Sequence, residues 1–375
     1  MKLKTCISIL FLWFAIILLA QAPEGYYKNA EGKKDAALKT ALFQIIYRDA
    51  STPETSIPRY WSGKYSAAAG FFETADRTAD GYIWDMYSNK QCVRWSGCGL
   101  NREHNLPKSW FGISGGSEDK ESIGCDYHNL YPSDASPNSA KSNYPLGMVS
   151  SATYNNGVVK VGTSAISISG YTGRVFEPAD EYKGDFARCY MYMVTCYENY
   201  ANRWINKGTQ SMLQNNTYPT LKPYAVDLLI KWHRDDPVSE KEINRNNEVY
   251  RVQGNRNPFV DFPELAEHIW GNLKNTVWRD TDKFYIIYDK KTKKLSASLN
   301  NPENGEGNVE IRILNEKFSS NSTVDVIIYN VAGMKILSEK LNSDSTIDLS
   351  QLPKGIYVIL AYGDSIRGAE KFLVQ

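Results

Sequence analysis

Three short stretches carry most of the information in this chain: Asn101-Arg102-Glu103-His104, Asp126-Tyr127-His128-Asn129-Leu130 and Asn138-Ser139-Ala140-Lys141-Ser142-Asn143. They place a carboxylate beside a histidine and then supply an amide oxygen and a lysine. A hard cation such as Mg²⁺ takes oxygen ligands from one or two side chains and keeps several waters. A neighbouring imidazole can act as general base on an attacking water. These residue types therefore suit metal-assisted hydrolysis of a phosphodiester.

The length and the charge of the chain set its broad class. At 375 residues it exceeds the usual size of a single hydrophobic core, so two domains are expected. The composition, with 42% hydrophobic and 23% charged residues, is that of a folded protein. The formal net charge is only +1, so any attraction to a polyanion must come from a local basic patch rather than from the whole chain.

The N-terminus has the pattern of a targeting segment. Met1-Lys2-Leu3-Lys4 gives a basic start, residues 7–20 are apolar, and Ala20-Gln21-Ala22 resembles a cleavage site. The apolar run is short for a membrane span, which needs about 20 residues. We therefore expect residues 1–22 to be a signal peptide, the mature protein to be secreted or held at the cell surface, and no membrane span to be retained. A retained anchor is the alternative.

The cysteines outside that leader are odd in number, so they cannot all pair within one chain. Cys92 and Cys98 flank a Trp/Gly turn and predict a local disulfide in an oxidising compartment. Cys189 and Cys196 are seven residues apart on a helical pattern, so they share a face. It is equally consistent with the sequence that Cys189 and Cys196 are simply two buried thiols. The chain has no Cys-x-x-Cys pair, which argues against a zinc-thiolate site.

The hydrophobic pattern changes at about residue 281. Before that point, helical spacing is found over residues 33–47, 186–200, 225–232 and 263–270, the last with Pro263 at its first position. Ser239 with Glu242 forms a capping box. After that point, short β-branched and aromatic runs separated by turns predict a small sandwich over residues 282–375.

Three other segments have weaker patterns. Residues 82–87 predict a strand. Residues 130–146 are rich in Pro, Ser and Asn, and predict an ordered loop that passes into a short helix. Residues 158–168 alternate like a pair of strands that turns at Gly162. The fold class that follows is α+β, with a mainly helical domain over residues 23–281 and an all-β domain behind it.

In these stretches the chain resembles the bacterial endonuclease I nucleases of the His-Me finger (ββα-metal) class. The motif Arg-Glu-His-x-x-Pro-x-Ser-x-x-Gly is matched by residues 102–112, and Asp-x-His-Asn/His-Leu-x-Pro by residues 126–132. Asn-x-x-Arg-Ser-Asn is matched at Asn138, Ser142 and Asn143. Three later segments, residues 182–188, 245–246 and 253–261, also resemble the family. The resemblance spans about residues 30–272 and implies a ββα-metal core within the first domain.

The resemblance implies roles for the residues of the first and third stretches. Glu103 and Asn138 would be the protein ligands of one divalent ion, expected to be Mg²⁺, with Ca²⁺ or Mn²⁺ as alternatives. His104 would be the general base, with its other ring nitrogen fixed by a backbone carbonyl or a polar side chain. Lys141 stands where the family commonly has arginine; it keeps the positive charge but loses the bidentate fork. We expect Lys141 to meet substrate phosphate, unless it only lines a solvated loop.

The remaining residues of these stretches are expected to support the site. Asp126 and His128 would orient their neighbours by hydrogen bonds, and direct ligation of the metal by His128 is the alternative. Asn129 would position the first stretch. Arg102 would also support the site. Arg188, Arg245 and Arg256 are expected to hold helices together rather than to contact phosphates, and His233 and His268 to be ordinary helix-end residues.

The C-terminal segment carries a second resemblance. Residues 326–333, 347–357 and 371–374 look like a sorting domain that routes exported proteins through the type IX secretion machinery. A carbohydrate- or surface-binding β-module is the alternative for this part of the chain.

These observations together predict a secreted, metal-dependent endonuclease, expected to be a monomer, that cuts DNA and RNA with little sequence preference. Low specificity follows from contacts to the phosphate backbone rather than to base edges. Another metal-dependent phosphoesterase and a catalytically inactive surface-binding protein are the two competing hypotheses.

Overall fold

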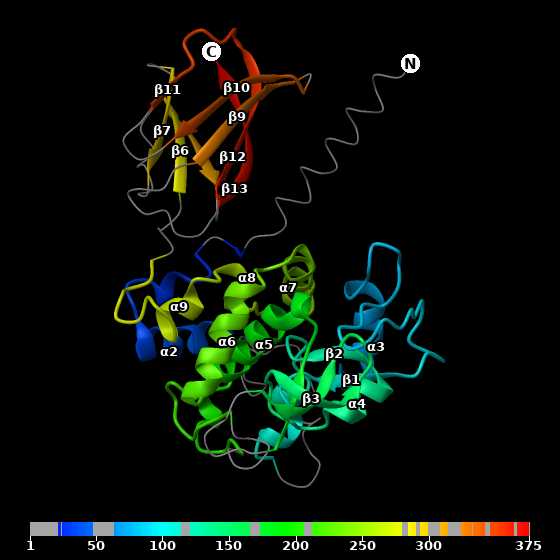
Figure 1. Cartoon of the computed structure of the whole chain (residues 1–375). Coiled ribbons are helices and arrows are strands. Elements are labelled where there is room, and N and C mark those ends of the chain that lie inside the picture. The colour runs from blue at the N-terminus through cyan, green and yellow to red at the C-terminus, as the bar shows by residue number, and fades with distance from the viewer. Residues whose placement is uncertain are drawn as a thin grey trace. The chain divides into compact units, whose positions relative to one another are not determined.

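The computed structural model describes residues 22–23, 25–47, 64–113, 121–165, 173–205, 212–279, 284–289, 293–298, 308–313, 324–331, 333–341, 346–363 and 366–374. The chain forms two compact units, the first ending at Trp278 and the second beginning at Arg279 (Figure 1). The predicted signal peptide lies outside the described residues, except for Ala22. Among the described residues, no helix is both long enough and apolar enough to cross a bilayer.

The first unit is mainly helical, with two small sheets. Its helices are α2 (Asp35–Ile46), α3 (Lys64–Ala75), α4 (Ala135–Lys141), α5 (Lys183–Cys196), α6 (Pro223–Asp235), α7 (Glu240–Gln253), α8 (Pro258–Asp261) and α9 (Leu265–Ile269). Its strands are β1 (Leu100–His104), β2 (Leu130–Asp134), β3 (Val149–Asn155), β4 (Lys160–Ser164) and β5 (Arg174–Glu177).

Helix α5 is the centre of this unit. Every one of its residues is buried, and it packs against α2 and α6. The predicted apolar stripe is confirmed as core, because its members Phe186, Tyr190, Met193, Tyr197 and Tyr200 are all buried. The helix differs from the prediction in its bounds. It ends at Cys196, and a short 3-10 turn, η6 (Glu198–Tyr200), follows.

The sheet β1–β2 and helix α4 pack against each other. The two strands are antiparallel, with Glu103 opposite Tyr131 and His104 opposite Leu130. Helix α4 begins directly after β2 and packs against both strands. The segment from residue 130, expected to be a loop, is therefore a strand first. Its Pro132 is tolerated because a two-stranded sheet leaves one edge of β2 without a partner.

Two other strand predictions are wrong. Residues 82–87 form no strand; only Ile83 makes an isolated bridge, to Arg77. The side chain of Asp85 instead accepts hydrogen bonds from Tyr87 N and Ser88 Oγ, which favours a turn. Gly162 is not a turn but lies inside β4, where a Cβ would come within 2.0 Å of the Ser151 carbonyl oxygen of β3.

The helix predicted from Pro263 also differs. Helix α9 covers only Leu265–Ile269, and the proline in the first helical position is Pro258, which opens α8 after the side-chain cap Asn257. The predicted capping box is confirmed at the start of α7, where Ser239 and Glu242 bond each other's backbone N–H groups.

The turn that leads into β2 is fixed by a buried carboxylate. Asp126 is fully buried and accepts hydrogen bonds from His128 N (2.8 Å), Gln253 Nε2 (2.7 Å) and the hydroxyls of Tyr192 and Tyr197 (both 2.7 Å). These donors belong to the turn itself, to the end of α7, to α5 and to the residue after α5. The carboxylate therefore joins the start of β2 to the core helix.

Three arginines hold the elements around this turn, as predicted. Arg245 of α7 pairs with Asp76 (2.7 Å) and donates to the carbonyls of Tyr127 (2.7 Å) and Leu130 (2.6 Å). Arg188 of α5 pairs with Glu242 at the start of α7, and Arg256 pairs with Asp261. All three side chains are buried, so they are structural.

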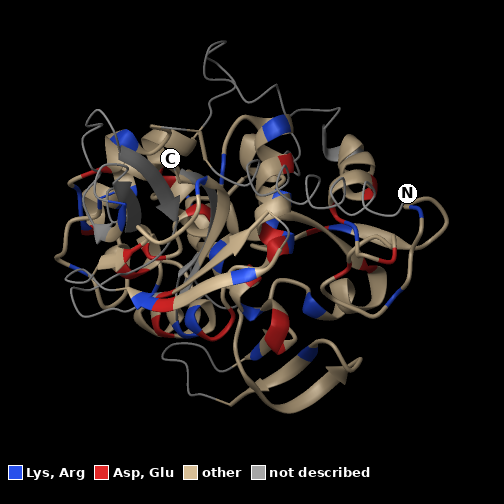
Figure 2. Cartoon of the chain, turned by 90° about the horizontal axis from the view of Figure 1, so that it is seen from above, with Lys and Arg blue, Asp and Glu red and all other residues tan. Residues whose placement is uncertain are grey.

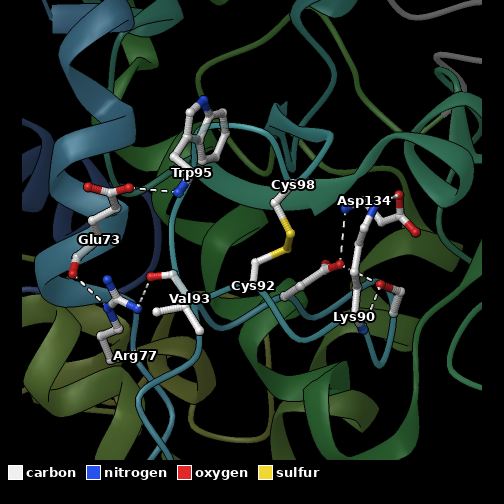
Figure 3. The surroundings of a disulfide bond; sticks show 10 residues. Glu73, Arg77, Lys90, Cys92, Val93, Trp95, Cys98 and Asp134 are labelled. Carbon is white, nitrogen blue, oxygen red and sulfur yellow. Dashed lines mark hydrogen bonds and ion pairs between the residues drawn. A yellow bond between two sulfur atoms is a disulfide. The ribbon is translucent and has the colours of Figure 1, made fainter.

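A disulfide closes the loop that leads into β1. Cys92 and Cys98 are bonded, with their Cα atoms 5.9 Å apart. Figure 3 shows Glu73 and Arg77 on one side of this loop and Lys90 and Asp134 on the other. Cys125, Cys189 and Cys196 are buried and are not in a disulfide, so Cys189 and Cys196 are the buried thiols that the sequence allowed.

The second unit consists of two four-stranded antiparallel sheets, with strand orders β10-β9-β12-β13 and β11-β7-β6-β8. The strands are β6 (Phe284–Asp289), β7 (Lys294–Ser298), β8 (Asn308–Ile313), β9 (Val324–Asn330), β10 (Lys335–Leu341), β11 (Thr346–Asp348), β12 (Gly355–Gly363) and β13 (Ile366–Val374). With the mainly helical first unit, the chain is α+β. Basic and acidic residues are interspersed over the described elements, in keeping with the net charge of +1 (Figure 2).

We predict that Asp126→Ala lowers the free energy of unfolding of the first unit by about 3 kcal/mol or more, because it leaves buried donors on α5 and α7 without an acceptor. Urea unfolding followed by tryptophan fluorescence measures the change. Asp80→Ala, at an exposed position, is the matched control and should shift the stability by less than about 0.5 kcal/mol. Equal stability of the two variants would contradict the assigned role.

We also predict that the first unit loses stability as the pH falls below about 6.5. Burial lowers the pKa of His233 to about 4, with Arg188 adding to the effect, and burial with Arg245 lowers the pKa of His128 well below its usual value. The unfolded state therefore binds protons that the folded state does not, so stability falls between about pH 6.5 and 4, for His233 by about 3 kcal/mol. Urea midpoints at several pH values test this. His233→Gln, which keeps a donor toward Pro263 O, should flatten the slope, and an unchanged slope would contradict it.

Candidate active site

Glu103 lies near the end of β1 and is paired with the lysine of the third stretch. Lys141, the last residue of α4, places Nζ 2.6 Å from Glu103 Oε1 and 3.3 Å from His104 O. The lysine side chain is fully buried, and Glu103 nearly so. Burial raises the pKa of the Glu103 carboxyl, and the charge of Lys141 opposes that rise. The sequence predicted that Lys141 meets substrate phosphate, whereas the structure places it against Glu103.

His104 is held in one tautomer. Its Nε2 lies 2.7 Å from the carbonyl oxygen of Gly124, in the 3-10 turn η4 (Ser122–Gly124). A carbonyl can only accept, so Nε2 carries the hydrogen. Burial lowers the pKa of His104 to about 4; the Gly124 carbonyl opposes this, and the charges of Lys108 and Lys141 add to it. At neutral pH the ring is therefore uncharged, with its lone pair on Nδ1.

Asn138 lies in α4, three residues before Lys141, and is half-buried. Residues three apart on a helix lie on the same face. Lys141 reaches Glu103 from this face, and α4 packs against β1. The helix therefore presents Asn138 on the same side as the Glu103 carboxylate.

The second stretch positions the first. Asn129 accepts a hydrogen bond from Leu106 N at Oδ1 (2.7 Å) and donates from Nδ2 to Leu106 O (3.1 Å). Its backbone carbonyl also accepts from Asn105 N (2.9 Å). The chain is thus clamped directly after His104. His128 contacts the core instead, with Nε2 3.3 Å from Asn255 O and its ring 4.5 Å from that of Tyr192.

Arg102, the residue before Glu103, lies over an aromatic ring. Its guanidinium carbon is 5.3 Å from the centre of the Trp95 ring, within the range of a cation–π contact. Arg102 and His104 are two residues apart on β1, so their side chains are on the same face of the strand.

Sequence reasoning missed two neighbours of His104. Lys108 opens the 3-10 turn η2 (Lys108–Trp110), is exposed, and has no ion pair with another described residue. This turn is tied to the chain after α4, because Asn143 Nδ2 donates to Ser109 Oγ (3.3 Å). Asn105 is fully buried, and neither atom of its carboxamide bonds a described residue. The available signal was proximity: both residues follow His104 within four positions.

These residues fit a hydrated divalent cation. A carboxylate and an amide oxygen, from Glu103 and Asn138, are ligands that Mg²⁺ prefers, and it keeps several waters. Buried polar groups without a protein partner are ordinarily satisfied by ordered water, and the Asn105 carboxamide is such a group beside the site. Among the described residues there is no cluster of three or more His, Cys, Asp or Glu side chains suited to a metal. An ion here would therefore depend on this mixed donor set and on water.

Two family models match the chain. The model of the endonuclease I family matches residues 35–264, which hold all of the side chains of this site. The model of the secretion system C-terminal sorting domain matches residues 301–375, within the second unit.

Individual relatives agree with the first match. The extracellular ribonuclease of Bacillus amyloliquefaciens is 34% identical over 269 residues, covering 68% of this chain and 81% of the relative. That of Bacillus subtilis (strain 168) is 33% identical, covering 65% of this chain and 78% of the relative. A periplasmic deoxyribonuclease of Aeromonas hydrophila is 26% identical, covering 48% and 59%. With its site carried on a matched segment that spans most of the first unit, this chain belongs to the endonuclease I family of nucleases.

Proposed function

We propose that this protein is an exported, metal-dependent endonuclease that hydrolyses phosphodiester bonds of DNA and RNA with little sequence preference, using His104 as general base. The proposal rests on the tautomer and the protonation state of His104, the residue next to Glu103. Its Nε2–H is held by the Gly124 carbonyl, and its lowered pKa leaves Nδ1 unprotonated at neutral pH. A base must be unprotonated and oriented to accept a proton from water.

Each step rests on a residue of this site. Nδ1 of His104 accepts a proton from water as the water oxygen bonds to phosphorus, and the opposite P–O bond breaks. A divalent ion held by Glu103 and Asn138 would supply charge stabilisation to the phosphate and the leaving oxygen. Asn129 keeps the strand end fixed, so that the base does not drift from its position.

The two lysines have different roles in this proposal. Lys141 is buried on Glu103 and lowers the cost of keeping that carboxylate charged in a dry environment. Lys108 is exposed near His104 and makes no ion pair with another described residue, so we assign it as the cation that meets the phosphate.

The substrate range and the destination rest on the relatives and on the tail. Relatives named as ribonucleases and as deoxyribonucleases both match this chain, and contacts to phosphate carry no base information. Extracellular and periplasmic relatives, with the sorting-domain match, support export through the secretion machinery that reads such tails.

We predict that His104→Ala reduces the rate of plasmid nicking by about 100-fold or more, because the general base is lost. Gel electrophoresis of supercoiled plasmid with Mg²⁺ measures the rate, and circular dichroism checks the fold. His233→Gln is the matched control, since it replaces a buried histidine away from the site and should keep activity near that of the wild type.

The wild-type protein should be inactive in EDTA and recover when Mg²⁺ is added. Full nicking by His104→Ala with metal present would overturn the assignment of the base. Cleavage of a small chromogenic phosphodiester without any action on plasmid or RNA would instead favour another phosphoesterase.

The two lysine roles predict opposite phenotypes. Lys108→Met should lower kcat/KM by about 10- to 100-fold, without a change in the urea midpoint, because it removes an exposed charge. Lys141→Met should destabilise the first unit by about 3 kcal/mol or more, since it leaves Glu103 buried without a counter-charge. Steady-state kinetics and urea unfolding of both variants separate the roles. Full activity in Lys108→Met would contradict the role given to that residue.

A further inference from the structure

The disulfide loop, residues 92–98, is held in place by hydrogen bonds and by its disulfide although it lies at the surface. Arg77 donates from Nη1 to the carbonyl of Val93 (2.7 Å), and Glu73 accepts the backbone N–H of Trp95 (2.6 Å). The Cys92–Cys98 bond closes the loop (Figure 3). A loop fixed in this way can present side chains at little further entropic cost.

The tip of the disulfide loop carries exposed side chains. Val93 is 61% exposed, and Arg94 beside it is exposed with no ion pair to another described residue. The nearby carboxylates are already engaged. Glu73 accepts from Trp95 N, and Asp134 is paired with Lys90 at 3.0 Å. Among the residues that the structure describes, Arg94 therefore has no ion-pair partner.

A second arginine, Arg102, contacts the disulfide loop through Trp95. The Trp95 ring has the Arg102 guanidinium carbon 5.3 Å from its centre and also packs against the ring of Phe72, at 5.4 Å. Arg102 and His104 share a face of β1, about 7 Å apart along the strand. The disulfide loop ends only two residues before β1 begins.

We propose that the disulfide loop with Arg102 is a binding surface for the phosphate backbone of the nucleic-acid substrate, beside the phosphate that is cut. Arg94 and Arg102 each contact one phosphate, and the closed loop and Trp95 hold them in place. The ligand class is a polynucleotide backbone, since guanidinium groups bind phosphates, and these two are carried on the strand of the base and on the loop that leads into it. This inference rests on the proposed nuclease function and extends it from the cleaved bond to its neighbours.

The test is the salt dependence of binding to a duplex of about 20 base pairs, measured by fluorescence anisotropy in EDTA so that no cleavage occurs. Each phosphate contact contributes about 0.9 to the slope of log K against log salt concentration. Arg94→Gln and Arg102→Gln should each make the slope shallower by about 0.9, and weaken binding several-fold at low salt. Arg94→Lys should keep the slope, because it retains the charge.

Lys274→Gln is the control, because it removes an exposed charge shortly after α9, and α9 lies on the side of the first unit away from β1 (Figure 1). It should leave both slope and affinity unchanged.

Urea midpoints report whether Arg102→Gln remains folded. If Arg102→Gln is unfolded, the test rests on Arg94→Gln, which alters only an exposed side chain. An unchanged slope in Arg94→Gln, with wild-type protein that binds and cuts nucleic acid, overturns this inference and leaves the nuclease function intact. Failure of the wild type to bind or cut any nucleic acid overturns both.

Discussion

The buried carboxylate of Asp126 is the constraint on which the site depends. A carboxylate in a dry interior is stable only when its oxygens are well hydrogen-bonded. Here the donors come from the turn, from the core helix α5, from the residue after it and from the end of α7. Satisfying that one group therefore brings elements distant in sequence to one point. Strand β2 starts four residues later, and its register with β1 places Glu103 and His104.

The same reasoning explains why charged side chains fill this interior. Arg188, Arg245 and Lys141 are each buried and paired, with Glu242, Asp76 and Glu103. Such pairs contribute little net stability, because removing two ions from water costs about as much as their attraction returns. They do disfavour other arrangements, because any slip leaves an uncompensated charge. The proposed site, with a base and two oxygen ligands in fixed positions, would benefit from that restriction.

The cysteines show how position decides chemistry in this chain. Cys92 and Cys98 close a surface loop, where their Cα atoms lie 5.9 Å apart. Cys125, Cys189 and Cys196 are buried thiols in the first unit. Burial raises the pKa of the Cys189 thiol far above its usual value, so it is an inert packing group. A disulfide at the surface and reduced thiols in the core are compatible with one oxidising compartment.

Local patterns in the sequence determined much of this protein. The apolar stripe of α5, the capping box of α7, the Cys92–Cys98 bond and the strand-rich tail can all be read from the pattern of residues close in sequence. The motifs around Glu103 and His104 also indicated the family. At two of the places where the pattern gave a wrong answer, a distant partner was responsible. Residues 130–134 are a strand because β1 pairs with them, and Gly162 lies within a strand because β3 passes close to it.

Only the tertiary structure decided what each polar side chain of the site does. The sequence gives Lys141 a positive charge but not its burial against Glu103, and it gives His104 a ring but not the Gly124 carbonyl that fixes its tautomer. It likewise gives no sign that Arg94 is exposed while Arg245 is buried. Sequence determines which groups are present and their local geometry. Burial and long-range pairing determine their charge state and their access to a substrate, because both depend on neighbours that only the folded chain brings together.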